Sequence, residues 1–205
     1  MRFFSVDSPL YKFISRFWDV LRLNFLWIVF SLPIVTIGAA TVAVFSVTLK
    51  MSENSEGYIV KQFVQAFKEN LKQGIFLGLM LLALCYLAYL NMEFFNKIEN
   101  NPIYFLFAAI IIMLAGMIYF TYAFAICARY ENTIINILKN SAAISMKYFG
   151  RTVLLWIVIA LLVMLFMFNS TLMFFGILIG PASVFFTISG FAISFFKEID
   201  GEKNE

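Results

Sequence analysis

Residues suited to acid–base or nucleophilic chemistry are scarce in this sequence. The chain has 205 residues and no histidine, the commonest general base and transition-metal ligand in proteins. Its two cysteines, Cys85 and Cys127, each lie inside an apolar run, where we expect small buried side chains and neither a disulfide nor a metal pair. The sequence contains no phosphate-binding glycine loop, serine nucleophile elbow or HExxH motif. We therefore predict a protein that is not an enzyme and has no cofactor.

Acidic residues are absent from most of the apolar runs. The runs 103–128, 152–168 and 172–196 contain no charged residue, and Glu93 lies near the end of the run 74–95. A carrier coupled to protons or sodium ions usually needs a carboxylate inside the membrane. The sequence therefore argues against a self-sufficient active transporter.

Basic residues concentrate in two polar segments, 58–72 and 129–151, whose spacing is that of amphipathic helices. We predict that both helices lie on the cytoplasmic membrane surface, where each cation would add about 1 kcal/mol of attraction to anionic headgroups. Docking of a cytoplasmic protein is the alternative explanation. The predicted surface cations are Lys61, Lys68, Lys72, Arg129, Lys139, Lys147 and Arg151. The predicted apolar faces are Ile59, Phe63, Phe67 and Leu71 in the first helix and Ile134, Leu138, Ala142, Met146 and Phe149 in the second.

Small residues follow one face of the last apolar run at alternating intervals of four and three. In lipid, such residues let two helix backbones approach closely, so we predict that this face packs against another span; lining of a pore is the alternative. Gly74 and Gly78 form a second candidate for close packing. The candidate packing residues of the last run are Gly176, Gly180, Ser183, Thr187, Gly190 and Ser194.

The elements that position these residues are membrane-spanning helices. Hydrophobic residues make up 62% of the chain and the mean hydropathy is +0.90, with several apolar runs of a length that can cross a bilayer. We predict an all-α, polytopic transmembrane helix bundle that forms a single domain, residues 1–205. Its predicted parts are an amphipathic lead-in (1–22), a proline-broken stretch (23–49), transmembrane helices at 74–95, 103–128, 152–168 and 172–196, and a polar tail (197–205).

The charge-free stretch 23–49 determines the predicted topology. A continuous helix of this length would be roughly 40 Å long, whereas the hydrocarbon core of a bilayer is about 30 Å thick. Proline removes a backbone hydrogen bond from a helix interior, so we predict a break at residues 31–33. Two arrangements follow, a single kinked span or a hairpin that turns near residues 33–38. The candidate kink residues are Pro33, Gly38 and, in the last span, Pro181.

The distribution of Lys and Arg favours the hairpin. Of the 15 Lys and Arg residues, a hairpin places fourteen inside and one outside, whereas a single kinked span places ten inside and five outside. We therefore predict that both termini are cytoplasmic. Cations also recur at an offset of 79 residues, as in Lys50 with Arg129 and Lys72 with Arg151. This recurrence indicates either a parallel duplication or the basic residue that any helix carries at its inner boundary.

Four short segments carry a resemblance to a known family. They are FSLPIVTIGA (30–39), GY (57–58), AFKENLKQ (66–73) and FGRT (149–152). Together they resemble the YesL family of bacterial integral membrane proteins, which have a domain of unknown function, over nearly the whole chain. The resemblance implies a multi-pass protein of the bacterial cell membrane that is often encoded beside carbohydrate ABC uptake systems and polysaccharide-degrading enzymes. It implies no catalytic or binding residue.

Our leading hypothesis is a non-enzymatic membrane protein that is accessory to carbohydrate uptake or polysaccharide utilisation. Its expected partners are the lipid bilayer and subunits of an ABC transporter, and we expect no nucleic acid. The alternative is a permease or channel-like carrier for a small polar solute, although the EAA-glycine signature of ABC permeases is missing. The residues that would shape such a passage are Pro33, Gly180, Pro181, Tyr86, Tyr119 and Tyr122.

Overall fold

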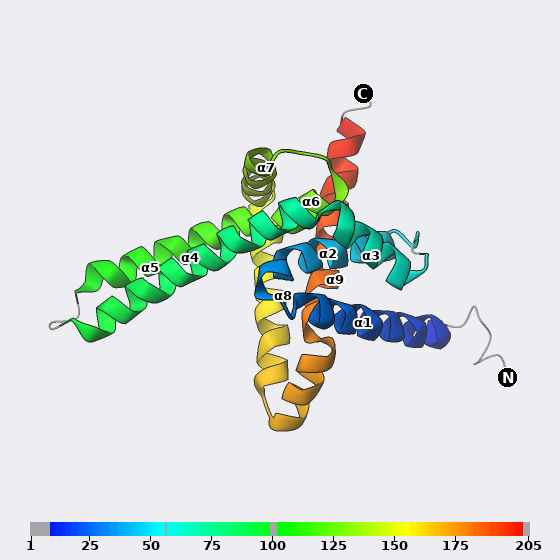
Figure 1. Cartoon of the computed structure of the whole chain (residues 1–205), viewed down its shortest axis with the longest axis horizontal. Helices are drawn as coiled ribbons and strands as arrows, with labels where there is room; N and C mark the ends of the chain where they lie inside the picture. Colours follow the sequence, from blue (N-terminus) through cyan, green and yellow to red (C-terminus); the bar gives the residue numbers. More distant parts are fainter. Residues whose placement is uncertain (1–8, 56, 99–101, 203–205) are drawn as a thin grey trace.

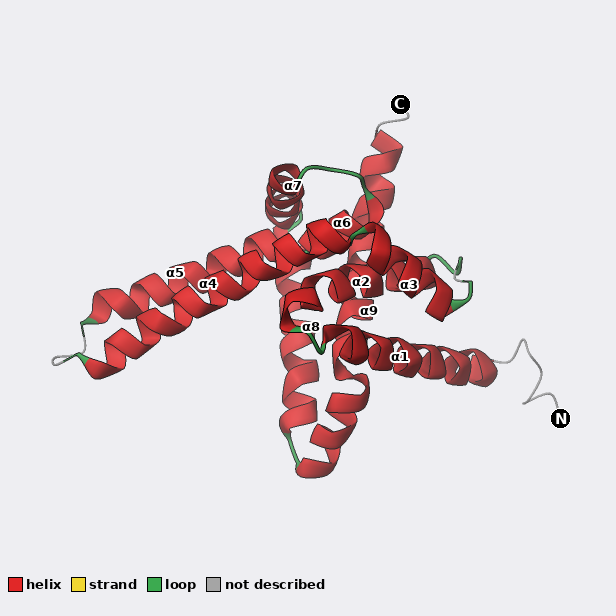
Figure 2. Cartoon of the chain, in the orientation of Figure 1, coloured by secondary structure: helices red, strands yellow, loops and turns green. Residues whose placement is uncertain are grey.

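The computed structural model describes residues 9–55, 57–98 and 102–202, and this part of the chain consists of helices joined by short connections (Figure 2). None of the described residues forms a strand, which confirms the predicted all-α fold. Residues 1–8 of the predicted lead-in, residues 99–101 of the link between two predicted spans, and residues 203–205 of the predicted tail lie outside the described residues.

The apolar runs of the sequence form long helices. In chain order the helices are α1 (Pro9–Ser31), the short 3-10 helix η1 (Ile34–Thr36), α2 (Ile37–Ser52), α3 (Ile59–Glu69), α4 (Leu71–Lys97), α5 (Ile103–Phe120), α6 (Ala123–Arg129), α7 (Ile134–Lys147), α8 (Phe149–Met167) and α9 (Ser170–Glu202). Five segments of the described chain are long and apolar enough to cross a membrane: Ile34–Ser52, Leu71–Lys97, Ile103–Arg129, Phe149–Met167 and Ser170–Gly201. The last four correspond to the four spans predicted after the proline-broken stretch.

The N-terminal stretch forms a helical hairpin. Helix α1 ends at Ser31, just before Pro33, and α2 returns alongside it. Two contacts show that the helices are antiparallel: the indole Nε1 of Trp27 donates to Thr41 Oγ1 (3.1 Å), and the guanidinium of Arg16 donates to the carbonyl of Met51 (2.8 Å). The break therefore lies where the proline predicted it. Helix α1 is not among the five segments above, so a membrane crossing by α1 stays a prediction.

Glycines allow α2 to cross α4 with the two backbones in contact. A Cβ atom added to Gly38 would lie 2.0 Å from the carbonyl oxygen of Gly74, and one added to Gly78 would lie 2.7 Å from Gly38 Cα. Larger residues would separate the helices, as expected for close packing in lipid. Gly38 was a candidate kink residue, but it lies inside α2, and the change of direction is complete by Thr36.

Two helical hairpins extend from the core in different directions, one toward the left and one toward the bottom of the view (Figure 1). Helices α4 and α5 form one, and α8 with the first half of α9 forms the other. Helix α2, most of which is buried, lies where they meet and packs against α3, α4, α6 and α9. Few residues of the two hairpins are buried within the chain, at most 17% of the apolar window of each span.

The two amphipathic segments form α3 and α7, but their apolar faces pack differently from the prediction. The apolar face of α3 lies on protein, because Phe63 is fully buried and its ring contacts that of Phe30, 5.2 Å away. Of the second predicted face, Met146 of α7 is exposed at 65%, and Phe149, which begins α8, is exposed at 58%. The buried face of α7 consists of Ile137, Ser141, Ile144 and Ser145.

Each of these two helices is followed, after one residue, by a long apolar helix. The junctions share a pair of backbone hydrogen bonds: Asn70 N–H to Ala66 O and Gly74 N–H to Asn70 O in the first, Tyr148 N–H to Ile144 O and Thr152 N–H to Tyr148 O in the second. The equivalent residues are 78 positions apart, one fewer than the offset between the cations. A duplication stays a prediction, now with a structural correspondence beside it.

Candidate functional site: an ion-paired end and two bridged helix breaks

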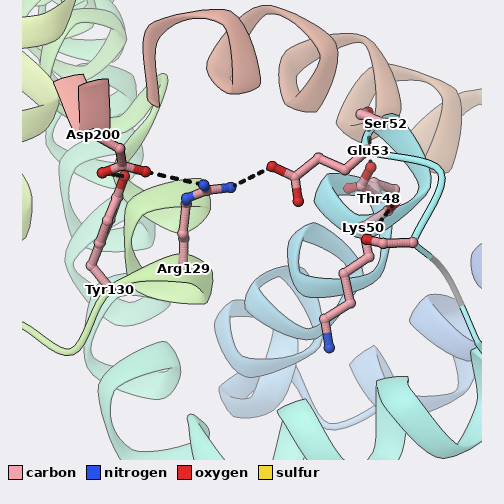
Figure 3. A network of polar contacts seen from close by, with 8 residues as sticks. Thr48, Lys50, Ser52, Glu53, Arg129, Tyr130 and Asp200 are labelled. Atoms are coloured by element: carbon pink, nitrogen blue, oxygen red, sulfur yellow. Dashed lines mark hydrogen bonds and ion pairs between the residues drawn. The ribbon is translucent and has the colours of Figure 1, made fainter. Parts of the chain in front are cut away.

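A charged network joins the last turns of three spans (Figure 3). Arg129 ends α6, and its guanidinium donates to Glu53 Oε1 at 2.9 Å and to Asp200 Oδ2 at 3.1 Å. Glu53 follows α2, and Asp200 lies in the last turns of α9. Two carboxylates thus compensate one half-buried guanidinium, an arrangement suited to the planar donor fork of arginine.

Aromatic rings complete the surroundings of Arg129. The guanidinium carbon lies 5.4 Å from the ring centre of Phe196 and 5.7 Å from that of Tyr130, within the range of a cation–π contact. The Tyr130 hydroxyl donates to Asp200 Oδ1 at 2.9 Å. Burial, and secondly this hydrogen bond, raises the pKa of Tyr130, so the phenol stays protonated. Arg129 therefore differs from the prediction of a free surface cation, because it is engaged inside the protein.

The other six predicted cations are exposed. Lys68 and Lys72 line a cavity of about 850 Å³ together with Arg129, but Glu69 and Glu131 line it too, so its charge is mixed. Arg151 lies over the rings of Tyr148 and Phe195 and 3.9 Å from Glu198 of α9. We call this part of the molecule the basic end, defined by the last turns of α2, α6 and α9 and by the α3–α4 and α7–α8 junctions. Its exposed cations are Lys68, Lys72, Lys147 and Arg151, whereas the exposed Lys61 and Lys139 lie in the first turn of α3 and in the first half of α7.

The start of α1 reaches the same end. Arg16 donates to the carbonyl of Met51 and to Asn54 Oδ1, both at the C-terminus of α2. A cation is favourable there because the unpaired carbonyls of a helix end carry partial negative charge. Arg16 therefore links α1 to the end of α2 from which Glu53 reaches Arg129.

Pro181 interrupts α9 in the apolar interior, and Asn24 of α1 bridges the interruption. Proline has no N–H, so the Ile177 carbonyl loses its usual partner. The Asn24 amide donates to the carbonyls of Ile177 (3.0 Å) and Leu178 (2.8 Å), and its Oδ1 accepts the Ala182 N–H (3.1 Å). Asn24 is fully buried. This side chain therefore supplies a partner for the Ile177 carbonyl, which the proline leaves without one, and it also binds two neighbouring backbone groups.

A second interruption separates α5 from α6 at Thr121 and Tyr122, where the sequence has no proline. Two serines of α7 bind the freed groups: Ser145 Oγ donates to the Ile118 carbonyl (3.1 Å), and the Tyr122 N–H donates to Ser141 Oγ (3.2 Å). Both serines are buried. Neither they nor Asn24 were identified from sequence, although a lone amide in a charge-free apolar run is a signal, because polar groups are costly in lipid.

The predicted small-residue face of α9 divides into two halves. Gly176 and Gly180 face Phe166 of α8; a Cβ added to Gly176 would lie 2.8 Å from that side chain, and one added to Gly180 would lie 3.6 Å from it. The hydroxyls of Ser183 and Thr187 bond carbonyls of their own helix. Two further members of the predicted face, Gly190 and Ser194, are exposed. The buried face beyond Pro181 contains instead Ala182, Ser189, Ala192, Ile193, Phe195 and Phe196.

The residues proposed for a passage do not lie together. Tyr86 and Tyr119 are exposed, at 61% and 44%, whereas Tyr122 is fully buried and its hydroxyl lies 3.2 Å from Thr152 Oγ1. Cys85 is exposed and Cys127 buried, and both are free thiols. Within the described ranges, no three His, Cys, Asp or Glu side chains are grouped so that they could hold a metal ion.

The fold and these contacts define an all-α, multi-pass membrane protein. Residues 20–92 match the model of a family described as "Protein of unknown function, DUF624". The match extends from α1 into α4 and includes Asn24, Pro33 and the glycine crossing of α2 with α4. No curated protein and no solved structure matches the chain. The family description states no activity, and the resemblance to the YesL family stays a prediction.

Proposed function

We propose that this chain is a non-catalytic membrane protein that acts by binding other integral membrane proteins, and that its partners are subunits of a carbohydrate uptake system. The observation that carries the proposal is the pair of diverging hairpins, whose exposed sides are apolar and contact little of the chain itself. Helices packed into one bundle would bury more of this surface against each other, whereas each separate hairpin leaves its outer sides to lipid and to other membrane helices. The carbohydrate part rests on the resemblance described above.

The distribution of charge supports a binding function over a chemical one. The described charges of the spans lie at their ends, as in the network of Arg129 or the ion pair of Glu93 with Lys97. The polar groups deeper in the protein, such as Asn24 and Thr48, bind the chain itself. The exposed cations of the basic end would face anionic headgroups or a cytoplasmic subunit of the same system.

Site-specific photocrosslinking in the native membrane tests this proposal. A photoreactive amino acid at Met113, exposed on α5, is expected to form adducts with permease subunits, whereas the same group at buried Ala109 is expected to form none. Mass spectrometry would identify the adducts. If Met113 gives only lipid adducts, the partner proposal fails. Adducts with proteins unrelated to uptake would refute the carbohydrate assignment.

A further inference from the structure

An apolar groove runs along the α8–α9 hairpin beside the Pro181 interruption. Its volume is about 460 Å³, and α1, α8 and α9 all contribute to its walls. All its lining residues have apolar side chains except Trp27, whose N–H is already bonded to Thr41. Other lining residues are Ile28 of α1, Phe166 of α8, and Met173, Gly180 and Val184 of α9.

The position of the groove matches one leaflet of a bilayer. On α9 the lining extends from Met173, close to the hairpin turn at Asn169, to Phe185. That distance is about 18 Å at 1.5 Å per residue, and half of a hydrocarbon core of about 30 Å is about 15 Å. Because both helices are long and apolar enough to span the membrane, the medium that reaches the groove is lipid.

Glycine creates part of the space. A Cβ at Gly180 would be in ordinary van der Waals contact with Phe166, so a longer side chain there would enter the groove. Water has no polar partner in such a cleft, and an empty cleft would lose the dispersion contacts of its walls. A flexible hydrocarbon chain of matching length makes dispersion contacts with the walls and needs no polar partner.

We propose that the groove binds one acyl chain of a phospholipid from the leaflet that surrounds the Asn169 end of the α8–α9 hairpin. The bound chain fills the space beside the Pro181 interruption and packs against α1, α8 and α9 together. This site is independent of the proposed partner-binding function, because it lies between helices of one chain.

Photolabelling from the bilayer tests the site. The full chain would be reconstituted in vesicles of phosphatidylglycerol and phosphatidylethanolamine that contain a phospholipid with a diazirine on one acyl chain. We expect several-fold more labelling at Val184 than at Ile157, an exposed α8 residue as far from Asn169 as Pro181 is. Equal labelling of the two positions would overturn the proposal, because it would show only the general lipid surface.

Two leucine variants show whether the labelling of Val184 depends on the groove or on any change in α9. Gly180→Leu is expected to reduce labelling of Val184 to the level of Ile157, whereas Gly190→Leu, at an exposed position where a Cβ meets no described atom within 4 Å, should leave the ratio unchanged. If Gly180→Leu does not fold, Met173→Trp offers a second block at a half-exposed position. An unchanged ratio in a folded groove variant, or equal losses in the Gly190→Leu control, would also overturn the proposal.

Discussion

The two interrupted spans expose the same kind of backbone groups but bind them with different side chains. In a continuous helix, Ala182 N–H would bond the Leu178 carbonyl, and Tyr122 N–H would bond the Ile118 carbonyl. In α9 a single asparagine from α1 binds both members of the pair. At the α5–α6 break two serines, one turn apart on α7, each bind one member.

The difference corresponds to the number of backbone groups that the bridging side chains bind. Pro181 also frees the Ile177 carbonyl, so the α9 interruption needs two donors and one acceptor, and a carboxamide offers both on one side chain. At the α5–α6 interruption, α7 binds one carbonyl and one N–H, and two hydroxyls supply the donor and the acceptor. An unpaired buried group is costly in an apolar medium, so each bridging residue ties its own helix to the interrupted one.

The largest effect is expected from Asn24→Leu. The substitution leaves the Ile177 carbonyl without a partner, and we expect the free energy of unfolding to fall by about 2 kcal/mol. Unfolding in detergent by heat or by SDS would measure the loss. The matched control is Asn91→Leu, because Asn91 lies on the projecting α4 and bonds only the Leu87 carbonyl of its own helix. A similar loss in both variants would show that the bridge to α9 has no special role.

Replacing Pro181 tests whether Asn24 stabilises the protein because it binds the backbone groups beside this proline. In Pro181→Ala the restored N–H can bond the Ile177 carbonyl. Adding Asn24→Leu to this variant should therefore lower the free energy of unfolding by less than it does in the natural sequence, the difference being about 1 kcal/mol or more. The same unfolding measurements, arranged as a double-mutant cycle, give this difference. Equal costs in the two backgrounds would contradict the explanation.

Serine substitutions in α7 are expected to cost less. Ser145→Ala leaves the Ile118 carbonyl unpaired and Ser141→Ala leaves the Tyr122 N–H unpaired, and each should lower the free energy of unfolding by about 1 kcal/mol. Ser194→Ala is the control, since this exposed hydroxyl bonds only Phe191 of its own helix. If the α7 variants are as stable as the control, relaxation of the α5–α6 break supplies other partners.

The smallest effect is expected at the edge of the same break. Trp156 of α8 donates its indole N–H to Thr121 Oγ1 at 3.0 Å, and Trp156→Phe keeps an aromatic ring but removes this bond. We expect a loss of roughly 0.5 kcal/mol, because the Thr121 hydroxyl keeps its contact with the Met117 carbonyl. Trp18→Phe, at an exposed position on α1, should change nothing measurable. A loss at Trp156 as large as that of Asn24→Leu would reverse the ranking.

Sequence patterns succeeded where the signal is local. Apolar runs identified the long helices, and Pro33 marked the end of α1. The amphipathic periods identified α3 together with its buried side, which includes Ile59 and Phe63. They identified α7 but not the face that it buries, because Ser141 and Ser145 count as polar in a periodicity although they are buried. The sequence at the α5–α6 break contains no proline or glycine, so no local signal predicted it. The sequence did not indicate the network of Arg129 for another reason. An arginine at a helix end is expected on the surface of any membrane protein.

By itself the sequence determined that this protein consists of apolar helices, where Pro33 breaks the first hairpin, and how the cations divide between the polar segments. These properties depend on neighbours along the chain, because the choice between lipid and water is made segment by segment. The packing of the helices is what places Asn24 at the backbone of α9, more than 150 residues away, and Arg129 between Glu53 and Asp200. Periodicity states which residues share a face, whereas the partner of that face is set by how all the helices pack together.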